Sequence, residues 1–272
     1  MKQVVYFLSH GGGPWPWIPE WNERYQGLRQ ATANIPNEIP QKPRAILMVS
    51  AHWVTQGGLA IMTNPKPDMF YDYYGFPEHT YHIQYPAPGD PILAKDIETH
   101  LIAAGFNIVE NSERGFDHGA FVPLALAFPD ADIPVVQLSI ERSFDPAYHI
   151  RLGQALSYLR DQNVLIIGSG LSFHNMRMFN PAGAAFSLQF DEWLREQILV
   201  ETAAAMSVFN LRKNALLQWE QAPSARFAHP MEDHLIPLMV AVGAAGEDKA
   251  FLHYHEDNTM GGIAASGFRF ES

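Results

Sequence analysis

The chain has 272 residues, of which 12 are histidine and none is cysteine. The missing cysteine excludes disulfides, thiolate metal sites, iron–sulfur clusters and cysteine nucleophiles, so any metal must bind histidine, carboxylate, backbone oxygen or water. The net charge of -11, without a basic run, argues against nucleic acid as a partner. No apolar stretch approaches the ~18 residues of a membrane span and no signal-peptide pattern is present, so we expect a cytoplasmic protein without a membrane partner.

The first half of the chain alternates between strand and helix patterns. Short apolar runs predict strands at residues 4–8, 44–50, 58–62 and 106–110. Helices are predicted at residues 20–33 and 91–104. The run at 44–50 is apolar at nearly every position, which is typical of a strand covered on both faces.

The same alternation continues through the second half. Strands are predicted at residues 135–140, 164–167, 250–253 and 267–270. Helices are predicted at residues 119–128, 146–160, 186–204 and 207–219, with another inside 231–245. This order predicts one α/β domain over residues 1–272, with a central, mainly parallel or mixed sheet flanked by helices.

Residues 64–90 interrupt the alternation with a long loop rich in tyrosine, phenylalanine, proline and glycine. Loops of this length inside a compact domain are usually functional or mobile. The loop either covers the core or forms a wall that faces a substrate, and the two roles are compatible.

Three histidines follow predicted strands. His10 follows the first strand, His52 follows the strand at 44–50, and His174 comes after the strand that ends at Ile167. Parallel strands deliver their carboxyl ends to one rim of a sheet, where ligands bind. Imidazole is the commonest metal-binding side chain, so we predict a metal site at the carboxyl ends of the strands.

Two further histidines are candidates for the same site. His118 lies in a glycine-flanked turn between a strand and a helix, where the adjoining Asp117 could orient its ring. His234 begins the helix inside 231–245. His229 is five residues earlier, so the two do not share a helix face and at most one points directly at a metal. A single histidine after a strand is more often a hydrogen-bonded turn residue, so the prediction rests on their combination.

The ordered short motifs of the chain resemble those of the class III extradiol ring-cleavage dioxygenases. This is the superfamily of the protocatechuate 4,5-dioxygenase catalytic subunit, and the most similar branch is that of the 4,5-DOPA extradiol dioxygenases. Each motif alone is weak, but together they span nearly the whole chain. The matching segments are residues 9–14, 49–53, 74–77, 85–89, 115–119, 131–139, 168–170, 174–175 and 229–238.

The resemblance implies an α/β fold that binds one Fe(II), which activates O2 beside a chelated catechol. His10 and His52 match metal ligands of the family, and His234 matches the third ligand of the DOPA branch. His174 matches a histidine that acts as a base in some relatives and lies in the coordination shell of zinc-bound ones. His118 matches the second acid–base histidine.

The third ligand is a departure from the wider superfamily, which uses glutamate in a two-histidine, one-carboxylate triad. Here Glu232, Asp233 and His234 are adjacent. The DOPA-like pattern favours His234, and an all-histidine site would make Zn(II) a plausible metal in a purified sample. Glu232 or Asp233 as the ligand would strengthen the case for iron.

The resemblance predicts a dioxygenase that opens a small aromatic diol with O2. His174 would accept a proton from the catechol, and His118 would donate one as the ring opens. Residues with a predicted substrate role are Tyr74, Phe76, Trp53 and His229.

Two alternatives use the same histidines: a zinc-dependent hydrolase or amidase, and a non-catalytic metal-binding member of the fold. The sequence leaves open which catechol is cleaved, whether the 4,5 or the 2,3 bond breaks, and whether the chain forms a homo-oligomer.

Overall fold

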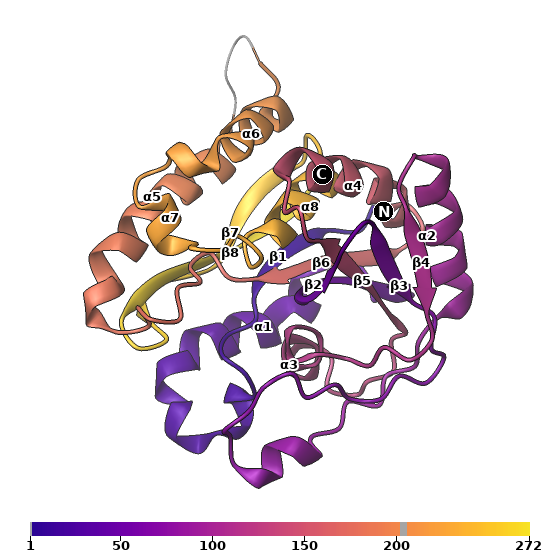
Figure 1. Cartoon of the computed structure of the whole chain (residues 1–272), viewed down its shortest axis with the longest axis horizontal. Coiled ribbons are helices and arrows are strands. Elements are labelled where there is room, and N and C mark those ends of the chain that lie inside the picture. The colour runs from indigo at the N-terminus through magenta and orange to yellow at the C-terminus, as the bar shows by residue number, and fades with distance from the viewer. Residues whose placement is uncertain (1, 202–205) are drawn as a thin grey trace.

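The computed structural model describes residues 2–201 and 206–272, and these residues form an α/β fold around one eight-stranded mixed sheet (Figure 1). The strand order across the sheet is β4-β3-β5-β2-β6-β1-β8-β7. In chain order the strands are β1 (Val5–Ser9), β2 (Ala45–Thr55), β3 (Leu59–Met62), β4 (Ile108–Asn111), β5 (Val135–Glu141), β6 (Val164–Gly170), β7 (Lys249–Thr259) and β8 (Ile263–Glu271).

The centre of the sheet is parallel. Strand β6 pairs in parallel with β1 on one side and β2 on the other, and β5 continues the parallel arrangement beyond β2. Antiparallel pairs occur where β3 meets β5 and where β8 joins β1 and β7. Strands β1 and β6 are buried at every position, which explains their continuous apolar sequence. The predicted α/β fold class with a mixed sheet is confirmed.

Helices cover both faces of the sheet. Helices α1 and α3 lie on one side, and α4 and α8 lie on the other (Figure 1). Every residue of α8 is buried because this helix packs between the sheet and α4. The α-helices are α1 (Gln26–Glu38), α2 (Pro91–Ala103), α3 (His118–Ala127), α4 (Pro146–Leu156), α5 (Ala184–Ile198), α6 (Val208–Leu217), α7 (Ala225–Ala228) and α8 (Ile236–Ala245).

Short 3-10 turns complete the helical structure. They are Trp15–Trp17, Pro19–Trp21, Glu23–Tyr25, Glu78–His82, Ser157–Arg160, Pro181–Gly183 and Trp219–Gln221. The helix predicted at 186–204 ends earlier, at Ile198, and its last predicted residues, 202–204, lie outside the described part of the chain. Among the described helices, none has the length and apolar character needed to cross a bilayer.

The last two strands are longer than predicted. β7 and β8 form an antiparallel hairpin of 11 and 9 residues. In β7 only Ala250, Tyr254 and Thr259 are buried, so the apolar run at 250–253 marks only a part of that strand.

The aromatic loop of residues 64–90 runs between β3 and α2. It is joined to the segment before α3 by a bridge between Met69 and Phe116, with a backbone hydrogen bond from Phe70 to Phe116 of 2.8 Å. Tyr73 and Tyr85 are buried in the core. The loop therefore covers the core while keeping a fixed position beside α3.

Candidate metal centre

The three central parallel strands deliver histidines to one rim, as the sequence predicted. His10 directly follows β1, and His174 lies four residues after the end of β6. Because β1, β6 and β2 are parallel neighbours, the chain leaves all three strands at the same edge of the sheet.

His52 differs from its predicted position after a strand, since β2 continues past it to Thr55. The pairing register with β5 shifts between Val49 and Val54. His52 lies inside this irregular stretch. A bulge of this kind bends the strand and re-aims a side chain, which explains how a residue within β2 can face the rim.

His118 is the first residue of α3, and its neighbour Asp117 caps that helix. The Asp117 carboxylate accepts hydrogen bonds from the Ala120 backbone N–H (3.1 Å), the Ser50 hydroxyl (2.7 Å) and the Arg114 guanidinium (2.6 Å). Asp117 therefore does not orient the His118 ring, contrary to the sequence interpretation.

The residue that orients the His118 ring is Asp72. Its Oδ1 accepts the His118 backbone N–H at 2.9 Å and lies 2.9 Å from the ring Nδ1 of the same residue. Asp72 comes from the aromatic loop, so the loop takes part in the site through a carboxylate as well as through its rings.

His234 lies in a turn just before α8, and a glycine of β6 sets its position. The Leu171 backbone N–H donates to the His234 carbonyl at 3.1 Å. A Cβ built on Gly170 would lie 2.1 Å from that carbonyl oxygen. Only glycine permits such a close approach of the two backbone segments.

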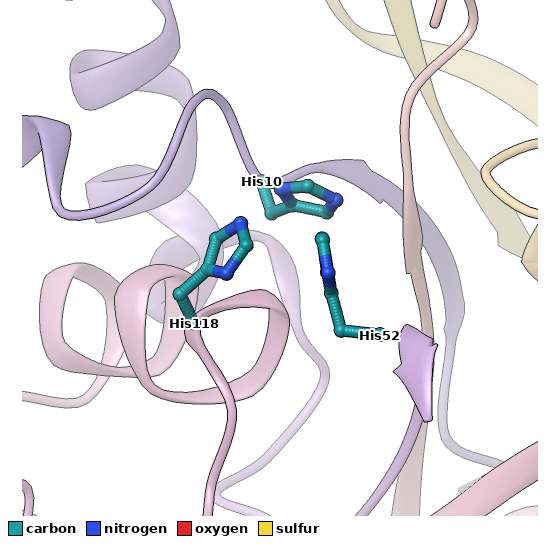
Figure 2. Close-up of side chains that lie close together, drawn as sticks. All are labelled: His10, His52 and His118. Atoms are coloured by element: carbon teal, nitrogen blue, oxygen red, sulfur yellow. The ribbon is translucent and has the colours of Figure 1, made fainter. Parts of the chain in front are cut away.

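The imidazoles of these elements converge. Figure 2 shows the rings of His10, His52 and His118 pointing toward one another, and each offers a ring nitrogen within 4.8 Å of the others. His234 completes the group, because its Nε2 lies 3.2 Å from the Nε2 of His52. The His174 ring stacks on His234 with a centroid distance of 3.4 Å. The structure thus brings together all five histidines that the sequence singled out for metal binding and catalysis.

Three of these rings have Nδ1 close to an oxygen atom. The partner of the His10 Nδ1 is the Gly11 carbonyl at 2.8 Å, and that of the His234 Nδ1 is an Asp233 oxygen at 3.0 Å. The His52 Nδ1 lies 3.1 Å from Asp72 Oδ2. A carbonyl or a carboxylate only accepts, so His10 and His234 carry the ring proton on Nδ1 and have a free Nε2 lone pair. The His52 contact lacks the geometry of a hydrogen bond, and only the charge of the carboxylate favours the same tautomer there.

These lone pairs fit a metal ion. The His10 Nε2 is buried without a hydrogen-bond partner among the described residues. The Nε2 atoms of His52 and His234 face each other at 3.2 Å. Metal–nitrogen bonds of about 2.0–2.1 Å hold two ligand nitrogens roughly 3 Å apart. The donor set suits Zn(II) or Fe(II).

Burial keeps the inner rings neutral. It lowers the pKa of His10, His52 and His234 well below the ordinary value, and the neighbouring imidazoles add to the effect. Burial also lowers the pKa of His174 to about 4 and raises that of Asp233 to about 6. Neutral imidazole is the form that binds metals.

The three adjacent candidates for the third ligand point in different directions. The Glu232 carboxylate forms an ion pair of 2.6 Å with Arg226. The Asp233 carboxylate contacts the outer nitrogen of His234. Of the three, His234 is the residue whose free nitrogen faces His52.

A cavity of about 580 Å³ opens beside these histidines. Phe76 and Tyr74 line it, the latter exposed at the surface, as their predicted substrate role requires. Trp53 and His229 do not line it. Trp53 is buried with the Arg114 guanidinium 5.0 Å from its ring centre, and the His229 Nε2 is 2.9 Å from the Ser172 carbonyl. Both side chains therefore pack in the interior instead of facing a substrate.

The sequence interpretation missed two charged residues of the cavity, Asp72 and Arg24. Asp72 is the acidic residue inside the aromatic segment Tyr71-Asp72-Tyr73, and that contrast was a usable signal. Arg24 lies in a polar stretch where nothing local distinguishes it from other surface residues.

The sequence matches the family described as the catalytic LigB subunit of aromatic ring-opening dioxygenase over residues 7–269. The chain belongs to this family. It is accordingly an extradiol, ring-opening dioxygenase, and the resemblance noted from its motifs is confirmed. Enzymes of the family are metal-dependent, in agreement with the histidine cluster.

Two curated relatives and one solved structure are similar over most of the chain. A 4,5-DOPA dioxygenase extradiol of Beta vulgaris is 38% identical over 98% of this chain and 96% of its own length. The dioxygenase tasH of Hapsidospora irregularis is 37% identical over 93% of this chain and 81% of its own. A crystal structure of an uncharacterised Escherichia coli K12 protein superposes with a TM-score of 0.76 at 26% identity, covering 99% of this chain and 100% of that one.

Proposed function

We propose that the chain opens a catechol ring with O2, using Fe(II) held by His10, His52 and His234. The observation that carries the proposal is the convergence of the His10, His52 and His234 rings beside a cavity that His118 and His174 also line. Fe(II) held there would supply a Lewis acid for the catechol and the redox chemistry for O2. His10, His52 and His234 would hold the ion as neutral ligands at the wall of the cavity that they line.

His174 is proposed as the residue that accepts a proton from the catechol. Its lowered pKa of about 4 keeps the imidazole neutral at neutral pH, with a lone pair available. The ring is partly exposed, with its Nδ1 3.9 Å from an Asp233 oxygen. A catechol in the cavity can reach it directly, as a general base requires.

His118 is proposed as the second acid–base group. The Asp72 carboxylate keeps a proton on Nδ1, so Nε2 is the atom that exchanges protons with a bound substrate. The His118 and His52 ring centres are 3.9 Å apart, which puts His118 next to the ligand set. A proton taken up at Nε2 is then available to the opening ring.

The proposed substrate class is a catechol that carries a carboxylate. Of the described residues that line the cavity, Arg24 alone has a cationic side chain, in a chain whose net charge is -11. The Asp72 carboxylate is already engaged by two imidazoles. Arg24 therefore offers an anion-binding group at the exposed side of the cavity. The relatives named 4,5-DOPA dioxygenases support an amino-acid-like catechol of this kind.

Oxygen uptake tests the proposed reaction. Metal-free protein is loaded with Fe(II) without air and mixed with catechol, dopamine, DOPA and 3,4-dihydroxyphenylpropionate. We expect one O2 consumed per catechol, with a yellow ring-opened product whose structure identifies the bond that breaks. The Zn(II)-loaded and metal-free proteins should consume none. No uptake on any catechol, together with ester or amide hydrolysis by the Zn(II) form, would favour the zinc hydrolase instead.

The role of Arg24 is tested by Arg24→Gln. We expect kcat/KM to fall about 10-fold for DOPA and dihydroxyphenylpropionate, because an exposed charge-assisted contact is lost. The value for dopamine and catechol, which lack the carboxylate, should stay the same. Lys66→Gln is the matched control, since Lys66 is exposed and does not line the cavity. An equal loss on all four catechols would contradict carboxylate recognition.

A further inference from the structure

Asp72 connects the wall of the cavity to the histidine cluster. It lies in the loop between β3 and α2, next to the buried Tyr73, whose ring centre is 6.0 Å from that of His118. The Asp72 side chain is only 10% exposed. A carboxylate at such a depth needs fixed partners to offset the loss of hydration.

The partners of Asp72 are two histidines with different tasks. Its Oδ1 accepts the backbone N–H of His118 at 2.9 Å and lies 2.9 Å from the His118 Nδ1. Its Oδ2 lies 3.1 Å from the Nδ1 of His52. One carboxylate thus contacts a proposed metal ligand and a proposed acid–base residue at the same time.

The Asp72 carboxylate influences which ring nitrogen of His52 and of His118 carries the proton. The His118 ring donates its Nδ1 proton to Oδ1. The His52 Nδ1 lies close to Oδ2 without the geometry of a hydrogen bond, and the negative charge of this oxygen favours a proton on that Nδ1 as well. The Nε2 of His52 is then a lone pair that faces the Nε2 of His234 at 3.2 Å. The Nε2 of His118 is likewise free on the side of the cavity. Both functional atoms therefore depend on the same residue.

We propose that Asp72 is a positioning residue that fixes the orientation and the tautomer of His52 and His118 together. The inference rests on the proposed function, because it takes those two histidines as metal ligand and acid–base group. It predicts that one substitution in the aromatic loop weakens metal binding and proton transfer at once.

Asp72→Asn separates this role from a merely structural one. Asparagine keeps one oxygen, which can still accept the His118 backbone N–H and anchor the loop to α3. Its NH2 group replaces the other oxygen and cannot accept a proton from an imidazole Nδ1. With the amide oxygen kept on His118, the NH2 group faces the His52 Nδ1 and the negative charge beside that ring is lost, while the fold keeps its backbone contact.

The first measurement is metal binding, which needs no substrate. Metal-free protein is titrated with Co(II) in competition with a chelator, and the visible spectrum of the bound ion is recorded. We expect Asp72→Asn to bind Co(II) about 10–100-fold more weakly than the parent protein, the usual effect of losing an outer partner of a ligating histidine. Asp68→Asn is the matched control: it removes the same charge from an exposed position of the same loop and should bind like the parent.

The second measurement reports the tautomers directly. Metal-free proteins labelled with 15N in their histidine rings are prepared, and their ring nitrogen shifts are compared. The parent and Asp68→Asn should carry the protons of His52 and His118 on Nδ1, and Asp72→Asn should change this for at least one ring. With saturating Fe(II), kcat of Asp72→Asn should fall about 10-fold or more while KM changes little.

The outcomes decide the inference. Unchanged Co(II) affinity and unchanged ring shifts in Asp72→Asn would overturn it. If the parent opens no catechol but Asp72→Asn still loses Co(II) affinity and changes its ring shifts, positioning holds and the proposed function fails. Should Asp72→Asn not fold, the test passes to Asp72→Glu, which keeps the charge but moves it by one methylene. Weaker Co(II) binding by a folded Asp72→Glu supports positioning, and parent-like binding and turnover overturn it.

Discussion

His118 is the residue at which metal binding and catalytic turnover can best be tested separately. Its ring meets His10 and His52, yet its Nδ1 is held by a loop carboxylate and the residue begins a helix. His10 and His234 are buried as His118 is, but their Nδ1 atoms face a backbone carbonyl and the neighbouring Asp233 instead. Histidines of one cluster therefore have different hydrogen-bond partners, and we expect different roles for them.

Replacing His118 with Phe should leave Fe(II) binding intact and lower kcat about 10²-fold, because a general acid–base group contributes roughly that much. Iron content and steady-state oxygen uptake measure the two effects. His82→Phe is the control, since His82 is an exposed histidine of the aromatic loop. Full turnover would remove His118 from the proton path, and loss of iron from a folded variant would move it into the ligand set.

At the scale of elements, the glycines at the end of β6 allow the turn before α8 to lie directly against the backbone of that strand. The Gly170 Cα faces the His234 carbonyl, and a Gly168 Cβ would lie 2.3 Å from the Pro237 carbonyl. Backbone atoms at such distances cannot move aside without moving the turn. The segment Gly168-Ser169-Gly170 therefore contributes to the site through its missing side chains.

Gly170→Ala should destabilise the protein by roughly 1–3 kcal/mol and weaken Co(II) binding, because the added methyl group displaces His234. Urea unfolding and Co(II) titration measure the two effects. Gly27→Ala, in α1, is the control: its Cβ would meet the end of the Glu256 side chain, which can move. Parent-like stability and binding in Gly170→Ala would mean that the turn before α8 adapts freely.

The predictable elements are those whose pattern reflects burial on both faces. β1 and the first part of β6 are nearly uniform apolar runs, and β5 is apolar at four of its seven positions, so the existence of these strands and their shared rim follow from the sequence. β2 was predicted too short because the polar Ser50 and His52 lie inside it, at an irregularity that a pattern of burial does not encode. Hairpin β7–β8 was shortened for a similar reason, since much of β7 is exposed.

For the site, too, only the residues placed by strand ends could be predicted from the sequence. His10, His52 and His174 could be assigned to one rim because topology alone brings strand ends together. The contact of Asp72 with two imidazoles depends on how a long loop folds back on α3, and no local periodicity predicts it. Trp53 and His229 were misjudged for the opposite reason, because an aromatic or polar side chain near a motif can as well be packed inside.

For the molecule as a whole, buried neutral histidines link stability to pH. His149 is fully buried in α4, where the Asp145 carbonyl accepts a hydrogen bond from its Nδ1 (2.8 Å) and its Nε2 accepts the Glu141 backbone N–H (3.0 Å). Burial lowers its pKa from 6.5 to about 4. The unfolded chain therefore binds a proton at this residue at a higher pH than the folded chain does.

The contribution of neutral His149 to the free energy of unfolding should be fully present above pH 6.5. It should be lost as the pH falls from 6.5 to about 4. The contribution of His149 to this loss is on the order of 3 kcal/mol. Urea unfolding of the metal-free protein across this range should give a smaller loss for His149→Gln than for the parent. Equal pH dependence of the two proteins would assign the acid sensitivity to other groups.

The histidines that meet at the rim are far apart along the chain: His52 and His234 are separated by 182 positions. An unfolded chain cannot hold them around one ion, so a metal binds the folded state almost exclusively. Each tenfold increase of free metal above its dissociation constant then adds about 1.4 kcal/mol to the free energy of unfolding. The supply of metal thus changes the stability of the whole chain. The amount of folded protein in a cell should therefore rise with the amount of metal that the cell provides.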